Sequence, residues 1–264
     1  MGKAIVITSG KGGVGKSTAA VNIGTCLARS GRKVVIIDTD LGLRNLDVIM
    51  GLENMIVYNL VDVVKGSCRM KDALINSTFC PDLYLLPAAQ TKNKSAVLTS
   101  SMYSLILDLK KEFDYVIIDC PAGIDQGFEN AITGADMGIV IATSDITSIR
   151  AADRVIGLLQ AHGIRDNHLI LNRLRSDLMH NDKMMSVEDI TEILAIDLLG
   201  LIPEDDSVIV STNQGKPVSD LPSPAGTAYK NICCRLEGED KPFPDFTRQE
   251  SIFSKLTTMF HRTK

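Results

Sequence analysis

Nine consecutive residues near the start of the chain have the types and spacing of a phosphate-binding loop. Gly10, Gly15, Lys16 and Ser17 fit the pattern of glycine, four residues, then Gly-Lys-Ser/Thr. Glycines let backbone N–H groups converge on phosphate oxygens, the lysine reaches the β- and γ-phosphates, and the hydroxyl binds Mg²⁺. We therefore expect a nucleoside triphosphate with Mg²⁺ to bind the loop formed by Gly10, Lys11, Gly12, Gly13, Val14, Gly15, Lys16, Ser17 and Thr18.

The segments on either side of this loop follow the order that a phosphate loop requires. Residues 3–8 have the β-rich apolar pattern of a buried strand, and residues 16–30 carry apolar side chains at helical spacing. A helix that begins near residue 16 directs the positive end of its dipole at the bound anion. The alternative interpretation is a glycine-rich turn between a strand and a helix in another doubly wound protein.

A second apolar run ends in a carboxylate that could serve the same metal ion. Residues 115–119 read Tyr-Val-Ile-Ile-Asp, the form of a Walker B strand. Asp119 is therefore predicted to hold Mg²⁺ through a water molecule. The next residue is Cys120, whereas many ATPases place a glutamate there as the general base. The base must come from elsewhere or be missing.

The strand at 33–38 supplies a candidate base, because it leads directly into two carboxylates, Asp38 and Asp40. We expect Asp40 to orient or deprotonate the attacking water and to contribute to the metal site. Asp38 could support Lys16 or the metal's surroundings. Both roles require that the first two strands be near neighbours in the sheet. Otherwise the two acids are exposed groups at the end of a strand.

The order of apolar runs predicts an α/β fold with one doubly wound, mostly parallel sheet and helices on both faces. Ligands of such sheets bind beyond the carboxyl ends of the strands, where residues 10–17, 38–40 and 119–125 would meet. Further strands are expected at 82–87, 137–142, 168–172 and 197–202, and further helices at 95–112, 147–162, 186–195 and 223–237.

Bulk composition narrows the class of protein. The 264 residues are 45% hydrophobic and 23% charged, which is ordinary for a globular chain. A net charge of −4 gives no overall electrostatic footprint for nucleic acid, so no nucleic-acid partner is expected. The six cysteines lack zinc-site or Cys-x-x-Cys spacing and are interpreted as reduced thiols of a cytoplasmic protein. No apolar run approaches the roughly 20 residues of a membrane-spanning helix.

The C-terminal residues differ in composition from the rest of the chain. Residues 1–237 are expected to form the nucleotide-binding domain, and the proline-containing stretch 238–250 to form a linker. Residues 251–264 have the pattern of an amphipathic helix lying on an anionic membrane surface. A terminal helix packed on its own domain is the alternative. The predicted membrane contacts are Ile252, Phe253, Lys255, Leu256, Met259, Phe260 and Arg262.

The additional lysine of the loop, Lys11, carries a more specific resemblance. Lys-Gly-Gly-Val-Gly-Lys-Ser-Thr resembles the deviant Walker A motif of the ParA/MinD superfamily of ATPases. The resemblance extends through segments 38–47, 119–124, 199–205 and 213–218. It implies ATP as the nucleotide, and a homodimer in which Lys11 reaches the partner's nucleotide. It also implies that the adenine is held by Asn172, Arg173, Pro203, Glu204 and Asp205.

Within the superfamily the chain is most similar to the septum-site-determining branch. That resemblance implies an ATP-dependent dimer, peripherally bound to the inner membrane, that recruits the division inhibitor MinC. It further implies a second partner, MinE or an equivalent stimulator of hydrolysis and release. The polar side of helix 147–162, with Arg150, Asp153 and Arg154, is the expected docking surface. Three alternatives remain open: a DNA-partition ATPase, a flagellar-number regulator of the same type, and an iron–sulfur carrier or nitrogenase-like reductase.

The C-terminal segment gives the first testable prediction. Deletion of residues 251–264 should leave the fold intact and abolish sedimentation with anionic liposomes in the presence of ATP, because the apolar contacts are removed. Circular dichroism of the shortened chain provides the control for folding. Liposome binding that persists after the deletion would contradict the membrane role of this segment.

Overall fold

The computed structural model describes residues 1–42, 44–90, 97–175 and 185–244. The strands are β1 Lys3–Thr8, β2 Val34–Asp38, β3 Ile75–Asn76, β4 Leu83–Leu86, β5 Tyr115–Asp119, β6 Met137–Ala142, β7 Asn167–Leu174 and β8 Asp197–Pro203. The longer helices are α1 Lys16–Arg29, α5 Thr99–Glu112, α6 Gln126–Ile132, α7 Ile146–Ala161, α9 Val187–Leu194, α10 Ser207–Asn213 and α11 Pro224–Leu236. Short helical turns are α2 Leu46–Ile49, η1 Glu53–Met55, α3 Leu60–Val64, α4 Met70–Ala73 and η3 Val218–Asp220.

These strands form one sheet in the order β3-β4-β2-β5-β1-β6-β7-β8. Every pairing is parallel except that of the short edge strand β3 with β4. The predicted fold class is therefore confirmed. The first two predicted strands, β1 and β2, are near neighbours but not adjacent, because β5 lies between them and pairs with both.

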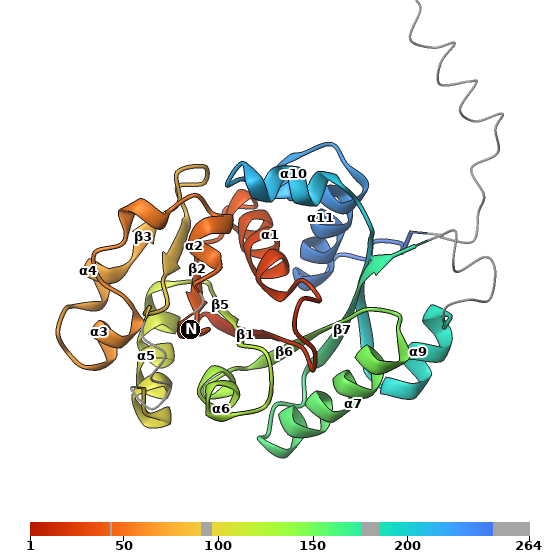
Figure 1. Cartoon of the computed structure of the whole chain (residues 1–264), viewed down its shortest axis with the longest axis horizontal. Coiled ribbons are helices and arrows are strands. Elements are labelled where there is room, and N and C mark those ends of the chain that lie inside the picture. The colour runs from red at the N-terminus through yellow and green to blue at the C-terminus, as the bar shows by residue number, and fades with distance from the viewer. Residues whose placement is uncertain (43, 91–96, 176–184, 245–264) are drawn as a thin grey trace, which may run out of the picture.

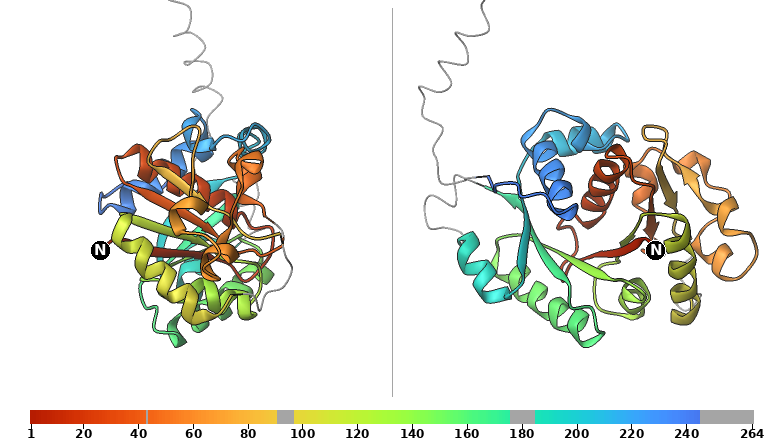
Figure 2. Two further views of the ribbon diagram at one scale, coloured as in Figure 1. Left: turned by 90° about the vertical axis from the view of Figure 1, so that its left-hand side faces the viewer. Right: turned by 180° about the vertical axis from the view of Figure 1, so that it is seen from behind.

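Helices cover both faces of the sheet, as Figure 1 and the reverse view in Figure 2 show. One apolar layer lies between the sheet and α1 with α11, and includes Ile23, Leu27 and Ile232. The other lies between the sheet and α5, α6, α7 and α9, and includes Ile106 and Val155. Central strands are buried on both sides, so their side chains form apolar runs without alternation, as expected for a parallel sheet.

Helix ends follow local chemistry and differ slightly from the predicted bounds. Asp145 accepts a hydrogen bond from the Ser148 amide and thereby fixes the start of α7 at residue 146. The expected helix 95–112 begins only at Thr99 in α5. The Val97 carbonyl, which precedes it, accepts a hydrogen bond from the Asn130 side chain at 3.0 Å. This tertiary contact holds residue 97 outside the helix.

Helix α11 fits closely between β8 and α1 (Figure 1). A methyl group added to Gly200 on β8 would lie 2.3 Å from the Ile232 side chain, so only glycine permits this approach. After α11, Arg235 donates hydrogen bonds to the carbonyls of Leu199, Lys241 and Pro242. The first residues of the expected linker 238–250 are thus held against the domain, whereas residues 245–264 lie outside the described residues.

No helix within the described residues is both long and apolar enough to cross a lipid bilayer. The seven side chains predicted to contact a membrane all belong to the segment that the structure does not describe. Their role remains a prediction, as does the division of the chain at residues 237 and 250.

The α11 contact yields a stability prediction. Replacing Ile232 with alanine should lower the free energy of unfolding by about 2–5 kcal/mol, because the fully buried side chain leaves a cavity against β8. Urea denaturation monitored by circular dichroism measures this difference. Thr227→Ala on the exposed side of the same helix is the matched control and should change stability by less than about 0.5 kcal/mol. Equal effects of the two substitutions would contradict the packing role.

Candidate nucleotide-binding site

The glycine-rich loop connects β1 to α1 at the carboxyl edge of the sheet. Gly13 and Gly15 have φ values of 75° and 102°, the left-handed region that favours glycine. Gly10 and Gly15 also permit close approach of neighbouring elements. A Cβ atom at Gly10 would lie 2.1 Å from the Ala151 carbonyl oxygen on α7, and one at Gly15 would lie 2.4 Å from Asn172 Nδ2 on β7. Packing against two elements therefore holds the loop in shape.

The two lysines of the loop have different surroundings. Lys16, the first residue of α1, is buried, and its Nζ donates a hydrogen bond to Ser9 Oγ at 3.1 Å. Ser9 in turn donates to the Lys11 carbonyl oxygen at 2.7 Å. Lys11 points outward instead, and its side chain is 49% exposed. Lys16 is thus fixed beneath the loop, whereas Lys11 lies at its surface.

Lys11 contacts the start of α7 in this structure. Its Nζ lies 3.3 Å from Asp145 Oδ1 and 3.1 Å from Thr147 Oγ1. Sequence reasoning did not identify these two contacts. The one available signal was that Asp145 precedes an apolar helical pattern, as a helix-capping residue does. Nothing in the local sequence connects that cap to a lysine in a distant loop.

Two buried carboxylates meet at the ends of adjacent strands. Asp38 on β2 is directly opposite Asp119 on β5 in the parallel register, and each is 2% exposed. Ser17, the second residue of α1, lies beside the Asp119 carboxyl group and opposes the rise of its pKa. The Asp40 amide donates to Asp38 Oδ1 at 2.9 Å. The sheet therefore brings together the carboxylates and the hydroxyl that the sequence predicted to act on one metal ion.

Burial makes these carboxylates hold their protons more tightly than usual. It raises the pKa of Asp38 to about 8, with a further contribution from the charge of Asp119. Burial likewise raises the pKa of Asp119 to about 7, while the nearby Ser17 side chain and the charge of Lys16 oppose the rise. A positive ion near both groups would lower their pKa values and favour the charged forms.

The oxygen atoms at this edge fit a magnesium ion. Asp119 Oδ1 is buried and has no hydrogen-bond partner among the described residues, which is a costly state for a carboxylate oxygen. Ser17 and Asp119 would supply the hydroxyl and carboxylate oxygens that Mg²⁺ prefers. No group of three His, Cys, Asp or Glu side chains among the described residues could hold a metal by itself. In proteins, Mg²⁺ is commonly bound by one or two carboxylates together with substrate phosphates and water.

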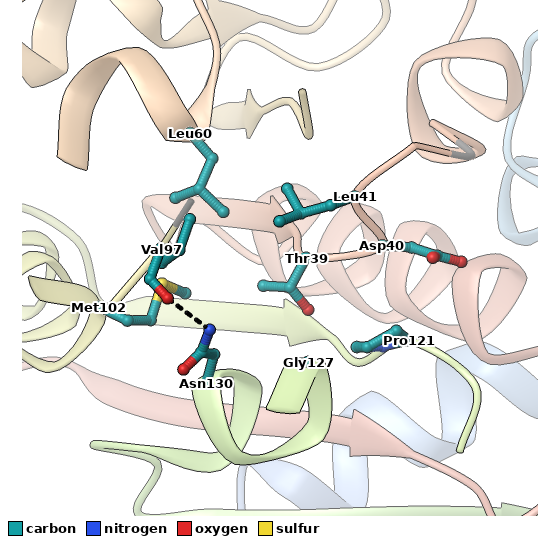
Figure 3. Close-up of a pocket in the computed structure, with 9 residues that line it drawn as sticks. All are labelled: Thr39, Asp40, Leu41, Leu60, Val97, Met102, Pro121, Gly127 and Asn130. Carbon is teal, nitrogen blue, oxygen red and sulfur yellow. Dashed lines mark hydrogen bonds between the residues drawn. The ribbon is translucent and has the colours of Figure 1, made fainter. Parts of the chain in front are cut away.

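The loop that follows β2 is tied to the end of β5. Thr39 Oγ1 donates to the Asp119 carbonyl oxygen at 2.6 Å, so the position of Asp40 depends on the Walker B strand. Thr39 and Asp40 line a pocket together with apolar residues, and in Figure 3 the Asp40 carboxylate points away from Leu60 and Val97 of that pocket. This contact of Thr39 was not anticipated, because a threonine after a strand gives no signal by itself.

The residues expected to hold adenine lie at the carboxyl ends of β7 and β8 and in the loop after β8, and several of them also make structural hydrogen bonds. Asn172 Nδ2 donates to the Val14 carbonyl at 2.7 Å, and its Oδ1 accepts from the Arg173 amide at 2.9 Å. Asp205 accepts hydrogen bonds from the amides of Ser207 and Ala225 and thereby joins the starts of α10 and α11. The adenine role of these side chains remains a prediction.

Two of the residues expected to hold adenine, Arg173 and Glu204, face the phosphate loop. Arg173 and Glu204 line an open pocket with residues of the loop and with Thr143, Ser144, Asp145 and Arg175. Arg173 has a φ of 57°, which turns the chain sharply after the buried Asn172. Pro203 ends β8, and the loop that follows is held by a hydrogen bond from the Glu204 amide to the Leu174 carbonyl at 2.9 Å.

The raised pKa of Asp38 gives a prediction for the pH dependence of stability. Without added nucleotide or Mg²⁺, the free energy of unfolding should fall as pH rises from about 4 to about 8. A carboxyl group with a raised pKa keeps its proton in the folded chain after the unfolded chain has lost it. Asp38→Asn should lessen this slope and stabilise the protein at pH 8 by about 1 kcal/mol or more.

Urea denaturation at pH 4.5 and pH 8 measures this effect. The matched control for the loss of one carboxyl group is Asp153→Asn at an exposed position on α7. A parallel pH profile for wild-type protein and Asp38→Asn would show that Asp38 does not carry a raised pKa.

Comparisons with known proteins identify the family to which this site belongs. The model of the CobQ/CobB/MinD/ParA nucleotide-binding domain matches residues 5–218. The chain is 50% identical to the septum site-determining protein MinD of Bacillus subtilis (strain 168) over 264 residues, which cover 98% of each chain. It is 44% identical to the MinD protein of Helicobacter pylori over 97% of this chain and 98% of that one.

Similar solved structures indicate the same family. The chain aligns with the Aquifex aeolicus MinC:MinD cell division protein complex at a TM-score of 0.86 and 41% identity, over 92% of this chain and 98% of that chain. It aligns with the Pyrococcus horikoshii OT3 MinD protein complexed with Mg-ADP at a TM-score of 0.81 and 26% identity, over 90% and 96% of the two chains. The chain therefore belongs to the CobQ/CobB/MinD/ParA nucleotide-binding family, within its septum site-determining MinD branch.

Proposed function

We propose that this chain is a Mg·ATP-dependent switch that dimerises with ATP, binds the inner membrane and helps to control the placement of the division septum. One observation carries the proposal. The loop holds one lysine buried beneath the phosphate site and presents a second, Lys11, at the molecular surface. A single nucleotide site needs the first lysine, and the second can serve the nucleotide of another subunit.

Hydrolysis would use the carboxyl edge of the sheet. Lys16 and the loop amides would hold the phosphates, while Ser17 and Asp119 would hold Mg²⁺, which stabilises the charge that develops on the phosphates. Asp40 would orient or deprotonate the attacking water, because Cys120, at the usual position of a general base, is buried and its pKa is raised to about 12 by burial. Asp38 would support Lys16 or the surroundings of the metal ion.

Dimerisation would require Lys11 to exchange one partner for another. Its ion pair with Asp145 is about half exposed on both sides, and such pairs contribute roughly 0–1 kcal/mol. Lys11 can therefore leave Asp145 at little cost. In a dimer it would contact the phosphates of the partner's ATP, where a positive charge aids transfer as an arginine finger does. Hydrolysis then depends on association of the two subunits.

Membrane attachment would depend on the same association. Five apolar side chains in 251–264 give on the order of 7–15 kcal/mol on full burial. Ordering about 14 residues costs roughly 1–2 kcal/mol each, so one segment binds weakly. Two segments on one dimer act together and can gain about 10²–10⁴ in avidity. ATP would therefore control how long the protein stays on an anionic membrane.

The proposed partners are the division inhibitor MinC and a stimulator equivalent to MinE. The similarity to the Aquifex aeolicus MinC:MinD complex supports the first partner. Helix α7 is the proposed docking surface, because its polar side exposes Arg150, Asp153 and Arg154. That helix also begins at Asp145, so a protein docked there would lie close to the Lys11 contact.

Lys11 provides the decisive test. Lys11→Ala should retain ATP binding, because Lys16 and the loop backbone remain, and should lose partner-stimulated hydrolysis almost completely. Fluorescent-nucleotide titration measures binding, and phosphate release in the presence of MinE and liposomes measures turnover. Lys65→Ala is the control at an exposed lysine outside the site, and it should behave like the wild type.

Three results would count against the proposal. An unchanged stimulated rate in Lys11→Ala would remove the role of Lys11 at a partner's nucleotide. A wild-type protein that stayed monomeric with a non-hydrolysable ATP analogue and Mg²⁺ would remove the coupling between ATP and membrane binding. ATP-dependent binding to non-specific DNA, without binding to liposomes, would instead indicate a DNA-partition ATPase.

A further inference from the structure

The contact between α1 and α11 brings together two cysteines from opposite ends of the chain. Cys26 is half-buried on α1, and Cys233 is 6% exposed on α11. The Cys233 thiol donates a hydrogen bond to the Ile23 carbonyl oxygen on α1, with an Sγ–O distance of 3.4 Å. In a helix, a side chain lies over the turn that precedes it, so Cys26 borders the same carbonyl as Cys233.

The thiol groups also interact with each other. Contact with the Cys233 side chain lowers the pKa of Cys26, although partial burial opposes this effect. Burial raises the pKa values of the other five cysteines. The thiolate is the reactive form of cysteine towards oxidants. Cys26 is thus the thiol best suited to react first, and Cys233 lies beside it.

We propose that Cys26 and Cys233 form a redox-sensitive site that closes into an intramolecular disulfide when the protein meets a peroxide. Cys26 attacks one peroxide oxygen and becomes a sulfenic acid, and one water molecule is released. The Cys233 sulfur then attacks the sulfenic sulfur, the S–S bond forms and a second water leaves. The two thiols supply the two electrons that reduce hydrogen peroxide to two water molecules, and a dithiol reductant reverses the change.

The bond would connect two functional parts of the chain. Helix α1 begins with Lys16 and Ser17 of the proposed nucleotide site, and α11 ends immediately before the C-terminal linker. Because the helices already pack on each other, the disulfide would form without rearrangement of the sheet. This site is separate from the proposed ATPase function, because Cys26 lies about two helical turns beyond the phosphate loop on α1.

Peptide mapping of the full-length protein tests the proposal. Folded protein is treated with a small excess of hydrogen peroxide, alkylated, digested with trypsin and analysed by mass spectrometry. The expected product links peptide 17–29, which contains Cys26, to peptide 231–235, and its mass is two hydrogens below the sum of the two peptides when the alkyl group on Cys234 is included. Dithiothreitol added before alkylation should abolish the linked peptide.

Single substitutions assign the partner within peptide 231–235, which contains both Cys233 and Cys234. Cys234→Ser should retain the linked product, whereas Cys233→Ser should lose it and leave Cys26 as a sulfenic or sulfinic acid. Cys68→Ser is the matched control at another half-buried cysteine and should retain the link.

Several outcomes would overturn the proposal. These are a link between Cys233 and Cys234, a link between two chains, or oxidised Cys26 beside fully alkylated Cys233 in the wild-type protein. If Cys233→Ser does not fold, the peptide maps of the wild type and of Cys234→Ser decide the question. The result does not depend on ATP hydrolysis or membrane binding, so it stands or falls separately from the proposed function.

Discussion

Two carboxyl groups are buried side by side at the edge of the sheet, and the arrangement of the site follows from that constraint. Asp38 and Asp119 face each other across β2 and β5, where the parallel register leaves no alternative. In a low-dielectric environment, like charges at short distance favour protonation unless a cation is present. Lys16 supplies part of that positive charge, and the unpartnered oxygen of Asp119 fits a metal ion for the remainder.

The phosphate loop divides its two lysines between different tasks by burial alone. Lys16 begins α1 and is held beneath the loop by Ser9, so its ammonium group has little freedom. Lys11 is held by an exposed ion pair, whose strength is comparable with thermal energy. One loop therefore holds one lysine rigidly and presents the other at the surface, which is the arrangement that the proposed switch requires.

Helix α11 links the nucleotide site to the C-terminal part of the chain. It packs on α1 and on β8, and Arg235 fixes the path beyond it through the Lys241 and Pro242 carbonyls. The guanidinium also lies 4.0 Å from the centre of the Phe243 ring, a favourable cation–π contact. The chain that follows Phe243 would thus leave the domain from a fixed point. This shortens the free tether, and a shorter tether raises the effective concentration of the following segment at a surface.

The sequence by itself determined the nucleotide loop, the α/β class and the carboxylates at the ends of the strands, because these depend on local patterns of glycine, apolar runs and charge. It did not determine that β5 lies between β1 and β2, that Lys11 contacts Asp145, or that Cys233 on α11 bonds to α1 next to Cys26. Each of these depends on elements that are distant in the chain. Strand order and helix packing arise from burial of apolar surface over the whole domain, so only the tertiary structure could decide them.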